Sequence, residues 1–288
     1  MLPLGVAFFY QNRKMKKING FTTKLFYREK GNPESPPLII FHGLWGASEN
    51  WLPVAKRLSS YFHVILPDCR NHGLSPHLSG HDYEYLSKDA CEFIRQLHLP
   101  GKPFLAGHSM GGKTLMTLLL QHPDIAEKAA IIDACPYPGP AENIHREIAD
   151  FMTSHPLDSY RKYNDIATLI RNSFPEEQIV QLFLKNIRKS SSGYEWKVNA
   201  SVLREYLPDL CGWHINSPVL YQQEILFVKG GLSNYIPPAS LPEIHRYFPA
   251  ASLQTIPGAT HRIHTDQPEK LAEILTNFFL PLTRQTSS

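Results

Sequence analysis

Residues 103–120 read P-F-L-A-G-H-S-M-G-G-K-T-L-M-T-L-L-L, an order that predicts a strand, a tight turn and a helix. A short apolar run, Phe104 to Ala106, precedes the turn, and Met110 to Gln121 follows it with helical composition and no proline. The pentad Gly107 to Gly111 matches G-x-S-x-G, in which a serine occupies a strained turn with its hydroxyl exposed. Glycine is expected at both ends of the pentad, because the strand and the helix pass too closely there to admit a Cβ.

The pentad alone is a loose pattern, since G-x-S-x-G also occurs in glycine-rich loops without a catalytic role. The strand before it and the helix after it favour a nucleophilic Ser109. A serine hydroxyl needs an imidazole to take its proton and a carboxylate to orient that imidazole. We expect His261, in the loop after the last strand, to be the base and Asp133, after the apolar run 129–132, to be the acid.

Asp133 is preferred as the acid because the loop after the next apolar strand lacks a carboxylate. That later strand leads into G-G-L-S-N-Y at 230–235. Asn234 could bond an imidazole but could not offset its positive charge. Asp133 instead comes at the end of the strand that directly follows the helix after Ser109, so its carboxylate should reach the same edge of the sheet as Ser109. A strand-end aspartate can also simply cap a turn, and in that case Asp209 is the next candidate for the acid.

Two backbone N–H groups are expected to stabilise the oxyanion of a tetrahedral intermediate. One belongs to Met110, the residue after the serine, and the other to Leu44, in the loop after an earlier strand. The side chains of both residues could also line an acyl pocket.

Composition excludes several other classes of protein. Of the 288 residues 19% are charged, and the formal net charge is +3. This balance of charges disfavours a nucleic-acid-binding protein, which usually carries a basic stripe on its surface. The four cysteines show no C-x-x-C and no metal-like spacing, so we expect reduced thiols, a cytoplasmic location and no metal site.

The N-terminus is a poor targeting signal. Met1 to Tyr10 is apolar but too short to span a bilayer, and no basic residue precedes it. We treat residues 1–17 as an extension outside the fold, with a translation start at Met15 as the alternative to Met1.

The rest of the chain alternates strands and helices, as an open parallel sheet requires. We expect an opening hairpin over Ile18 to Tyr27 and a final helix whose N-terminus carries a capping box of Asp266 and Glu269. The alternation stops over 136–213, which is predicted to be a helical lid between two strands. Residues 18–135 and 214–282 then form the core.

Six short motifs together carry a family resemblance. They are H-G-L-W-G at 42–46, D-C-R-N-H-G-L-S at 68–75, G-H-S-M-G-G-K at 107–113, I-I-D at 131–133, G-G-L-S-N-Y at 230–235 and H-R-I-H at 261–264. From Ile18 to Leu280 the chain resembles the lidded α/β-hydrolase esterases, in the branch shared by small bacterial cytosolic esterases and mitochondrial abhydrolase-domain lipases. Thr260 departs from this family, which usually has glycine before the histidine.

The resemblance implies an α/β-hydrolase fold, with a mostly parallel eight-stranded sheet, helices on both faces and a helical lid after strand 6. It implies a cofactor-free serine hydrolase of short- to medium-chain carboxylic esters or thioesters, among them acyl-CoA or lipid esters, with the chain order serine, acid, histidine. The expected partner is a small acyl ester or thioester, bound by a monomer or homodimer without a membrane span. Expected substrate-binding residues are His42, Trp45, His108, Phe151, Phe174, Phe183 and Trp196.

Other functions remain open at this point. Perhydrolase or C–C bond hydrolase chemistry would use the same residues, and a catalytically silent member could use the pocket only to bind a small molecule. Epoxide hydrolase and dehalogenase chemistry is disfavoured, because it needs a carboxylate where Ser109 stands. Basic residues of the lid, which could meet acyl-CoA phosphates, are equally typical of a solvated helix face; they are Arg161, Lys162, Arg171, Lys185, Arg188 and Lys189.

Overall fold

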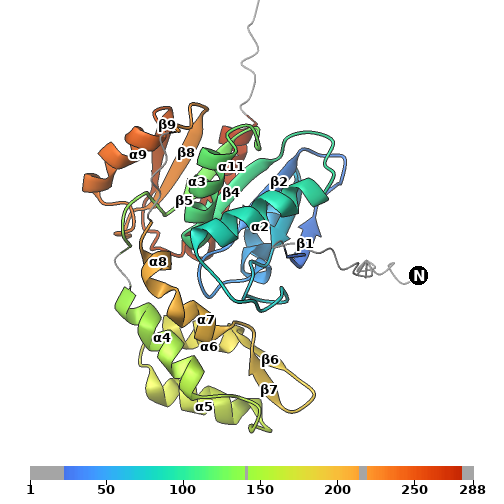
Figure 1. Ribbon diagram of the computed structural model, residues 1–288, viewed down its shortest axis with the longest axis vertical. Helices are drawn as coiled ribbons and strands as arrows, with labels where there is room; N and C mark the ends of the chain where they lie inside the picture. Colours follow the sequence, from blue (N-terminus) through green and yellow to red (C-terminus); the bar gives the residue numbers. More distant parts are fainter. Residues whose placement is uncertain (1–22, 140–141, 214–218, 281–288) are drawn as a thin grey trace, which may run out of the picture.

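Residues 23–139, 142–213 and 219–280 are described by the computed structural model, which has an α/β core and a second lobe beside it (Figure 1). The core contains a seven-stranded sheet in the order β1-β3-β2-β4-β5-β8-β9. In this sheet β1 runs antiparallel to β3, and the other neighbouring strands are parallel. The strands are β1 (Tyr27–Lys30), β2 (Pro37–Phe41), β3 (His63–Pro67), β4 (Phe104–His108), β5 (Ala129–Ile132), β8 (Ile225–Gly230) and β9 (Ala251–Ile256).

The mostly parallel sheet agrees with the sequence prediction, but the number of strands does not. Eight strands were expected, and the described residues form seven in the main sheet. The first described strand covers Tyr27–Lys30, whereas the first half of the opening hairpin expected over 18–27 lies outside the described residues, as does the extension 1–17.

Apolar side chains on both faces of the central strands explain why helices cover both faces. Every residue of β2 is buried. Leu38 and Ile40 belong to one hydrophobic cluster, while Ile39 and Phe41 belong to the other, because successive strand residues point to opposite faces. α1 (Leu52–Leu58) and α11 (Pro268–Phe279) pack together on the first face, and α2 (Tyr83–Gln96) and α3 (Met110–Gln121) pack together on the second.

Short elements complete the core. The first 3₁₀ turn, η1 (Ser48–Trp51), leads into α1, and the second, η2 (Pro238–Ser240), leads into α9 (Leu241–Tyr247). The short helix α10 (Ile263–Asp266) precedes α11. The capping box predicted there is wrong: Gln267 is the N-cap of α11 without a side-chain cap, and the carboxylate of Asp266 bonds Thr260 instead.

The segment between β5 and β8 forms the second lobe, which lies below the core in Figure 1. Its helices are α4 (Glu142–Ser154), α5 (Tyr163–Ser173), α6 (Glu177–Lys185), α7 (Ala200–Glu205) and α8 (Leu207–Cys211). It is not purely helical as predicted, because β6 (Ile187–Lys189) and β7 (Tyr194–Trp196) pair as an antiparallel hairpin. Because the described core has one strand fewer before this segment, it follows β5 rather than a sixth strand.

Hydrogen bonds join this inserted lobe to two core loops, 42–50 and 68–77. The Asn186 amide donates to the carbonyl oxygen of Trp45 at 2.8 Å. Asn199 donates from its backbone N–H to the carbonyl oxygen of Asn71 at 3.0 Å. The Arg188 guanidinium, in turn, donates to the carbonyl oxygen of Gly73 at 3.0 Å. Those two loops carry the H-G-L-W-G and D-C-R-N-H-G-L-S motifs, so residues of both motifs hold the inserted lobe against the core.

No helix in the described ranges is long and apolar enough to cross a membrane.

Candidate active site

Ser109 lies on a sharp turn between β4 and α3, as the pentad predicts. Its backbone has φ 52° and ψ −115°, a conformation that costs an L-residue free energy. A Cβ on Gly107 would lie 2.4 Å from the carbonyl oxygen of Gly111, and a Cβ on Gly111 would lie 2.4 Å from that of Phe41. Glycine is therefore required at both positions to let the turn pack against the sheet.

The imidazole of His261 lies between Ser109 and Asp133. Its Nε2 is 3.0 Å from Ser109 Oγ, and its Nδ1 is 2.8 Å from Asp133 Oδ2. The three residues come from the ends of β4, β5 and the loop after β9, which meet at one edge of the sheet. Because carboxylate oxygens only accept, Nδ1 carries the hydrogen, which leaves Nε2 free to accept the serine proton.

The carboxylate of Asp133 is completely buried and has a full set of donors. Oδ1 accepts from the backbone N–H of Gly230 at 3.0 Å. Oδ2 accepts from the hydroxyl of Ser233 as well as from His261. The G-G-L-S-N-Y loop after β8 therefore contributes donors to the carboxylate of Asp133 rather than a carboxylate of its own.

Two further contacts hold His261. The ring of Tyr235 stacks on the imidazole, with 3.5 Å between ring centroids and 11° between ring planes. On the backbone side, His108 donates from Nε2 to the carbonyl oxygen of His261 at 2.7 Å. Burial lowers the pKa of His108 well below its usual value, and the nearby His261 and His264 lower it further. His108 is thus a neutral ring that fixes the loop.

Thr260 closes the loop that carries His261. Its backbone N–H donates to Oδ2 of Asp266 at 2.8 Å, and its hydroxyl donates to the same oxygen. The hydroxyl also accepts from the backbone N–H of Arg262 at 3.3 Å. Threonine at this position therefore ties both sides of His261 to Asp266, a link that glycine could make only through its backbone.

The two expected oxyanion donors lie beside Ser109. Leu44 and Met110 line one cavity with it, and within the described chain neither backbone N–H donates to another protein atom. The next amide along, that of Trp45, is already used, because it donates to Nε2 of His72 at 3.2 Å. This leaves Leu44 as the loop amide that could reach an oxyanion.

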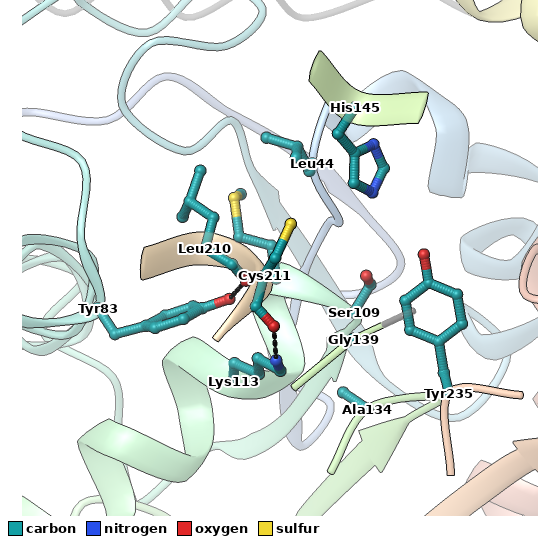
Figure 2. A pocket seen from close by; sticks show the side chains of 11 residues that line it. Leu44, Tyr83, Ser109, Lys113, Ala134, Gly139, His145, Leu210, Cys211 and Tyr235 are labelled. Carbon is teal, nitrogen blue, oxygen red and sulfur yellow. Dashed lines mark hydrogen bonds between the residues drawn. The ribbon is translucent and has the colours of Figure 1, made fainter. Parts of the chain in front are cut away.

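The cavity at Ser109 is small and mostly apolar (Figure 2). Its volume is about 30 Å³, against several hundred Å³ for a usual ligand site. Residues from the core and from the inserted lobe line it together: Leu44, Tyr83, Ser109, Met110, Lys113, Ala134, Gly139, His145, Leu210, Cys211 and Tyr235. A cavity of this size holds a water molecule rather than an acyl chain.

The seven residues expected to bind substrate do not line this cavity. His42 donates from Nδ1 to the carbonyl of Gly43 and accepts at Nε2 from the amide of Cys69, so both ring nitrogens are engaged. Trp45 is buried, and its indole N–H donates a hydrogen bond to Nδ1 of His145. His108 donates to the carbonyl oxygen of His261 and so holds the loop of that residue. The aromatic residues of the inserted lobe pack on one another in a cluster of Phe151, Phe174, Phe183 and Trp196.

Several cavity residues were missed by sequence reasoning. Lys113 lay in the G-H-S-M-G-G-K motif, and its ammonium donates to the carbonyl oxygens of Tyr137, Cys211 and Gly212. Burial lowers its pKa to about 8, but three carbonyl acceptors suit the ammonium form at neutral pH. His145 had no sequence signal, because one histidine on an amphipathic helix looks like any other.

Within the described ranges no group of three His, Cys, Asp or Glu side chains could hold a metal ion.

Comparisons with known proteins agree with the fold described above. Residues 36–268 match a family model described as alpha/beta hydrolase fold. The chain is 33% identical over 259 residues to the sn-1-specific diacylglycerol lipase ABHD11 of Danio rerio, covering 87% of this chain and 80% of that protein. It is 28% identical over 242 residues to Esterase YbfF of Escherichia coli (strain K12), covering 84% of this chain and 92% of that protein. Among solved structures, a marine microorganism esterase superposes with a TM-score of 0.85 and 34% identity, covering 89% of this chain and 99% of that chain.

Proposed function

Because the chain belongs to the α/β-hydrolase fold family, we propose that it is a serine esterase that cleaves carboxylic esters through an acyl-enzyme on Ser109. The observation that carries the proposal is the unbroken chain of hydrogen bonds from Ser109 through His261 to Asp133. Relatives named as esterases and lipases support the same reaction class.

The proposed reaction begins when Ser109 Oγ attacks the ester carbonyl carbon while Nε2 of His261 takes the hydroxyl proton. Asp133 offsets the charge of the resulting imidazolium and holds its Nδ1–H. The carbonyl oxygen becomes an oxyanion that the amides of Leu44 and Met110 stabilise. His261 then returns the proton to the alcohol oxygen as the C–O bond breaks, and a water molecule repeats the sequence to release the acid.

We propose that the inserted lobe acts as a lid. The cavity of about 30 Å³ is too small for an acyl ester, so the lobe must move away from the core before substrate binds. The lining supports an apolar acyl group, since most of its side chains are aliphatic, aromatic or thiol. Small acyl esters are the substrates we favour, and thioesters would follow the same steps.

Fluorophosphonate labelling joined to ester hydrolysis tests this proposal. The parent protein should label and should release butyrate from p-nitrophenyl butyrate, and Ser109→Ala should lose both, with kcat falling by about 10⁴- to 10⁶-fold. Ser154→Ala, on an exposed position of the inserted lobe, is the matched control and should behave as the parent. A parent protein that is folded but neither labels nor hydrolyses any ester would show that the pocket only binds.

A further inference from the structure

The stack between Tyr235 and His261 has almost no offset. The ring centroids are 3.5 Å apart, and the ring planes differ by 11°. Because carbon atoms of stacked rings do not approach much closer than about 3.5 Å, the two rings lie directly over each other. Neutral aromatic rings instead prefer an offset or an edge-to-face arrangement, since their negative faces repel. This face-to-face geometry therefore gives little stabilisation while His261 is neutral.

The same geometry becomes favourable when His261 carries a second ring proton. A cation over the face of an aromatic ring is attracted by the negative charge of that face. In the proposed reaction His261 becomes an imidazolium when it takes the proton of Ser109. The stack thus favours the charged ring that arises during the reaction over the neutral ring that precedes it, which is the kind of contact that raises kcat.

The histidines packed near His261 cannot offset its positive charge. His108, His145 and His264 interact with it electrostatically, and burial lowers the pKa of each below the usual value. The three rings are therefore neutral near pH 7. Asp133 bonds Nδ1 of His261 and supplies a full negative charge in the plane of the imidazole. The face of Tyr235 adds a second favourable contact, above that plane.

Both rings are held by loops of the core, so movement of the inserted lobe leaves the stack in place. Tyr235 follows β8, and His261 follows β9. The backbone N–H of Tyr235 donates to Oγ of Ser233 at 3.2 Å, and the hydroxyl of Ser233 in turn donates to Asp133. The carbonyl oxygen of Tyr235 accepts from Sγ of Cys135 at 3.1 Å. These bonds fix Tyr235 relative to the carboxylate that holds His261.

We propose that Tyr235 is a positioning residue whose ring face stabilises the imidazolium of His261 and so lowers the barrier to proton transfer from Ser109. This inference rests on the esterase function proposed above and adds a residue to its mechanism. Tyr235 lines the same cavity as Ser109 (Figure 2), but it acts through His261 and needs no contact with the ester. Acylation and deacylation both pass through the charged ring, so loss of the π face should lower kcat and kcat/KM together and leave KM unchanged.

Fluorinated rings test the charge of the face while nearly keeping the shape of the side chain. Tyr235→Phe removes the hydroxyl and keeps the π face, so its kcat on p-nitrophenyl butyrate should stay within about 3-fold of the parent. Tyr235→pentafluorophenylalanine, introduced by amber suppression, withdraws negative charge from the face. Its kcat should fall about 5- to 30-fold below that of the phenylalanine variant, the value of a cation–π contact in a partly buried site. Tyr235→para-fluorophenylalanine should lie between the two.

A matched control carries the same fluorinated ring at an exposed position. The side chain of Tyr61, in the turn between α1 and β3, is 55% exposed. Tyr61→pentafluorophenylalanine should therefore match the parent in kcat. Thermal denaturation should give similar Tm values for the Tyr235 variants, which separates an effect on the charged ring from damage to the loop. If the pentafluorinated variant does not fold, the para-fluorinated and phenylalanine variants decide the question between them.

The outcomes distinguish this inference from the function beneath it. A graded fall in kcat with increasing fluorination, at constant KM, supports the role of the Tyr235 face. Equal kcat in the fluorinated and phenylalanine variants overturns it. A loss in Tyr235→Phe as large as that in the pentafluorinated variant also overturns it, because the hydroxyl would then be the group that matters. A parent that neither labels with fluorophosphonate nor hydrolyses any p-nitrophenyl ester overturns the proposed esterase function itself.

Discussion

Ser233 donates its hydroxyl hydrogen to Oδ2 of Asp133, the same oxygen that accepts from Nδ1 of His261. The two residues are 100 positions apart in the chain. They meet because β5 and β8 are neighbours in the sheet and both end at the same edge. Asp133, the expected acid, and its supporting donors therefore follow two adjacent strands, and the loop after β8 positions the carboxylate that follows β5.

Asp133→Asn should lower kcat by about 10⁴-fold, because an amide NH₂ in place of Oδ2 would hold the imidazole in the wrong tautomer. It should also lower the free energy of unfolding by about 1–3 kcal/mol. Asparagine has one acceptor oxygen for the three donors that Asp133 now satisfies, which are Gly230, Ser233 and His261. Steady-state kinetics and urea denaturation measure the two effects. If the variant kept more than about a tenth of the parental kcat, Asp133 would not be the acid, and Asp209 would be tested next.

Thr260→Val should lower kcat by about 3- to 30-fold with little change in KM. Valine keeps the branched shape and the backbone N–H bond to Asp266, but it removes the hydroxyl that joins Asp266 to the amide of Arg262. Thr260→Ser keeps the hydroxyl and should recover most of the activity. The kcat of each variant should be compared with its folded fraction from circular dichroism. A loss of activity that only matched the loss of folded protein would argue against a positioning role for the Thr260 hydroxyl.

Much of the fold could be predicted because it depends on local pattern. Fully apolar runs identify β2 and β5, and α3 has the bounds that its composition predicts. The grouping of Ser109, Asp133 and His261 could be predicted as well, since each comes after a strand and parallel strands end at one edge of the sheet.

The features that could not be predicted depend on contacts between segments far apart in the chain. Nothing local shows that Asp266 bonds Thr260 rather than capping α11, because both uses suit an aspartate near a helix start. The aromatic residues of the inserted lobe look alike whether they meet a ligand or one another. The link between Trp45 and His145 spans 100 positions and has no periodicity.

Lys113→Met should destabilise the junction between the core and the inserted lobe. The ammonium is buried and donates to a carbonyl on the entry segment, that of Tyr137, and to two on the exit segment, those of Cys211 and Gly212. Methionine fills similar space but leaves all three acceptors without that donor, so the free energy of unfolding should fall by about 2–4 kcal/mol. Limited proteolysis should then cut the two segments earlier than in the parent. Unchanged stability and cleavage would mean that these contacts contribute little.

Phe183→Ala should act on stability rather than on substrate choice. The ring of Phe183 is fully buried and contacts those of Phe151, Phe174 and Trp196, away from the cavity at Ser109. Its removal should cost about 3–5 kcal/mol of unfolding free energy and lower activity by the same factor for p-nitrophenyl esters of every chain length. A loss confined to long acyl chains would instead indicate that the aromatic cluster opens to receive the acyl group.

Stability should fall steeply as the pH drops below about 6.5, and His81 allows one contribution to be isolated. Its ring is fully buried, and burial, with Arg70 and His42 nearby, lowers its pKa to about 3 from an unfolded value of 6.5. Between these two values the unfolded chain binds a proton that the folded protein does not, so the stability contributed by neutral His81 is present above pH 6.5 and lost on acidification. From pH 7 to pH 5 the loss from this one residue is about 2 kcal/mol.

His81→Gln removes that titration and keeps an oxygen that can accept from the amide of Asn71, the present partner of the ring. Urea denaturation at pH 7 and pH 5 should therefore show a smaller loss of unfolding free energy in the variant than in the parent, by about 2 kcal/mol. The buried His108, whose lowered pKa owes nothing to His81, titrates in the same direction in both proteins and cancels in the comparison. Equal losses in parent and variant would mean that His81 gains its proton without unfolding.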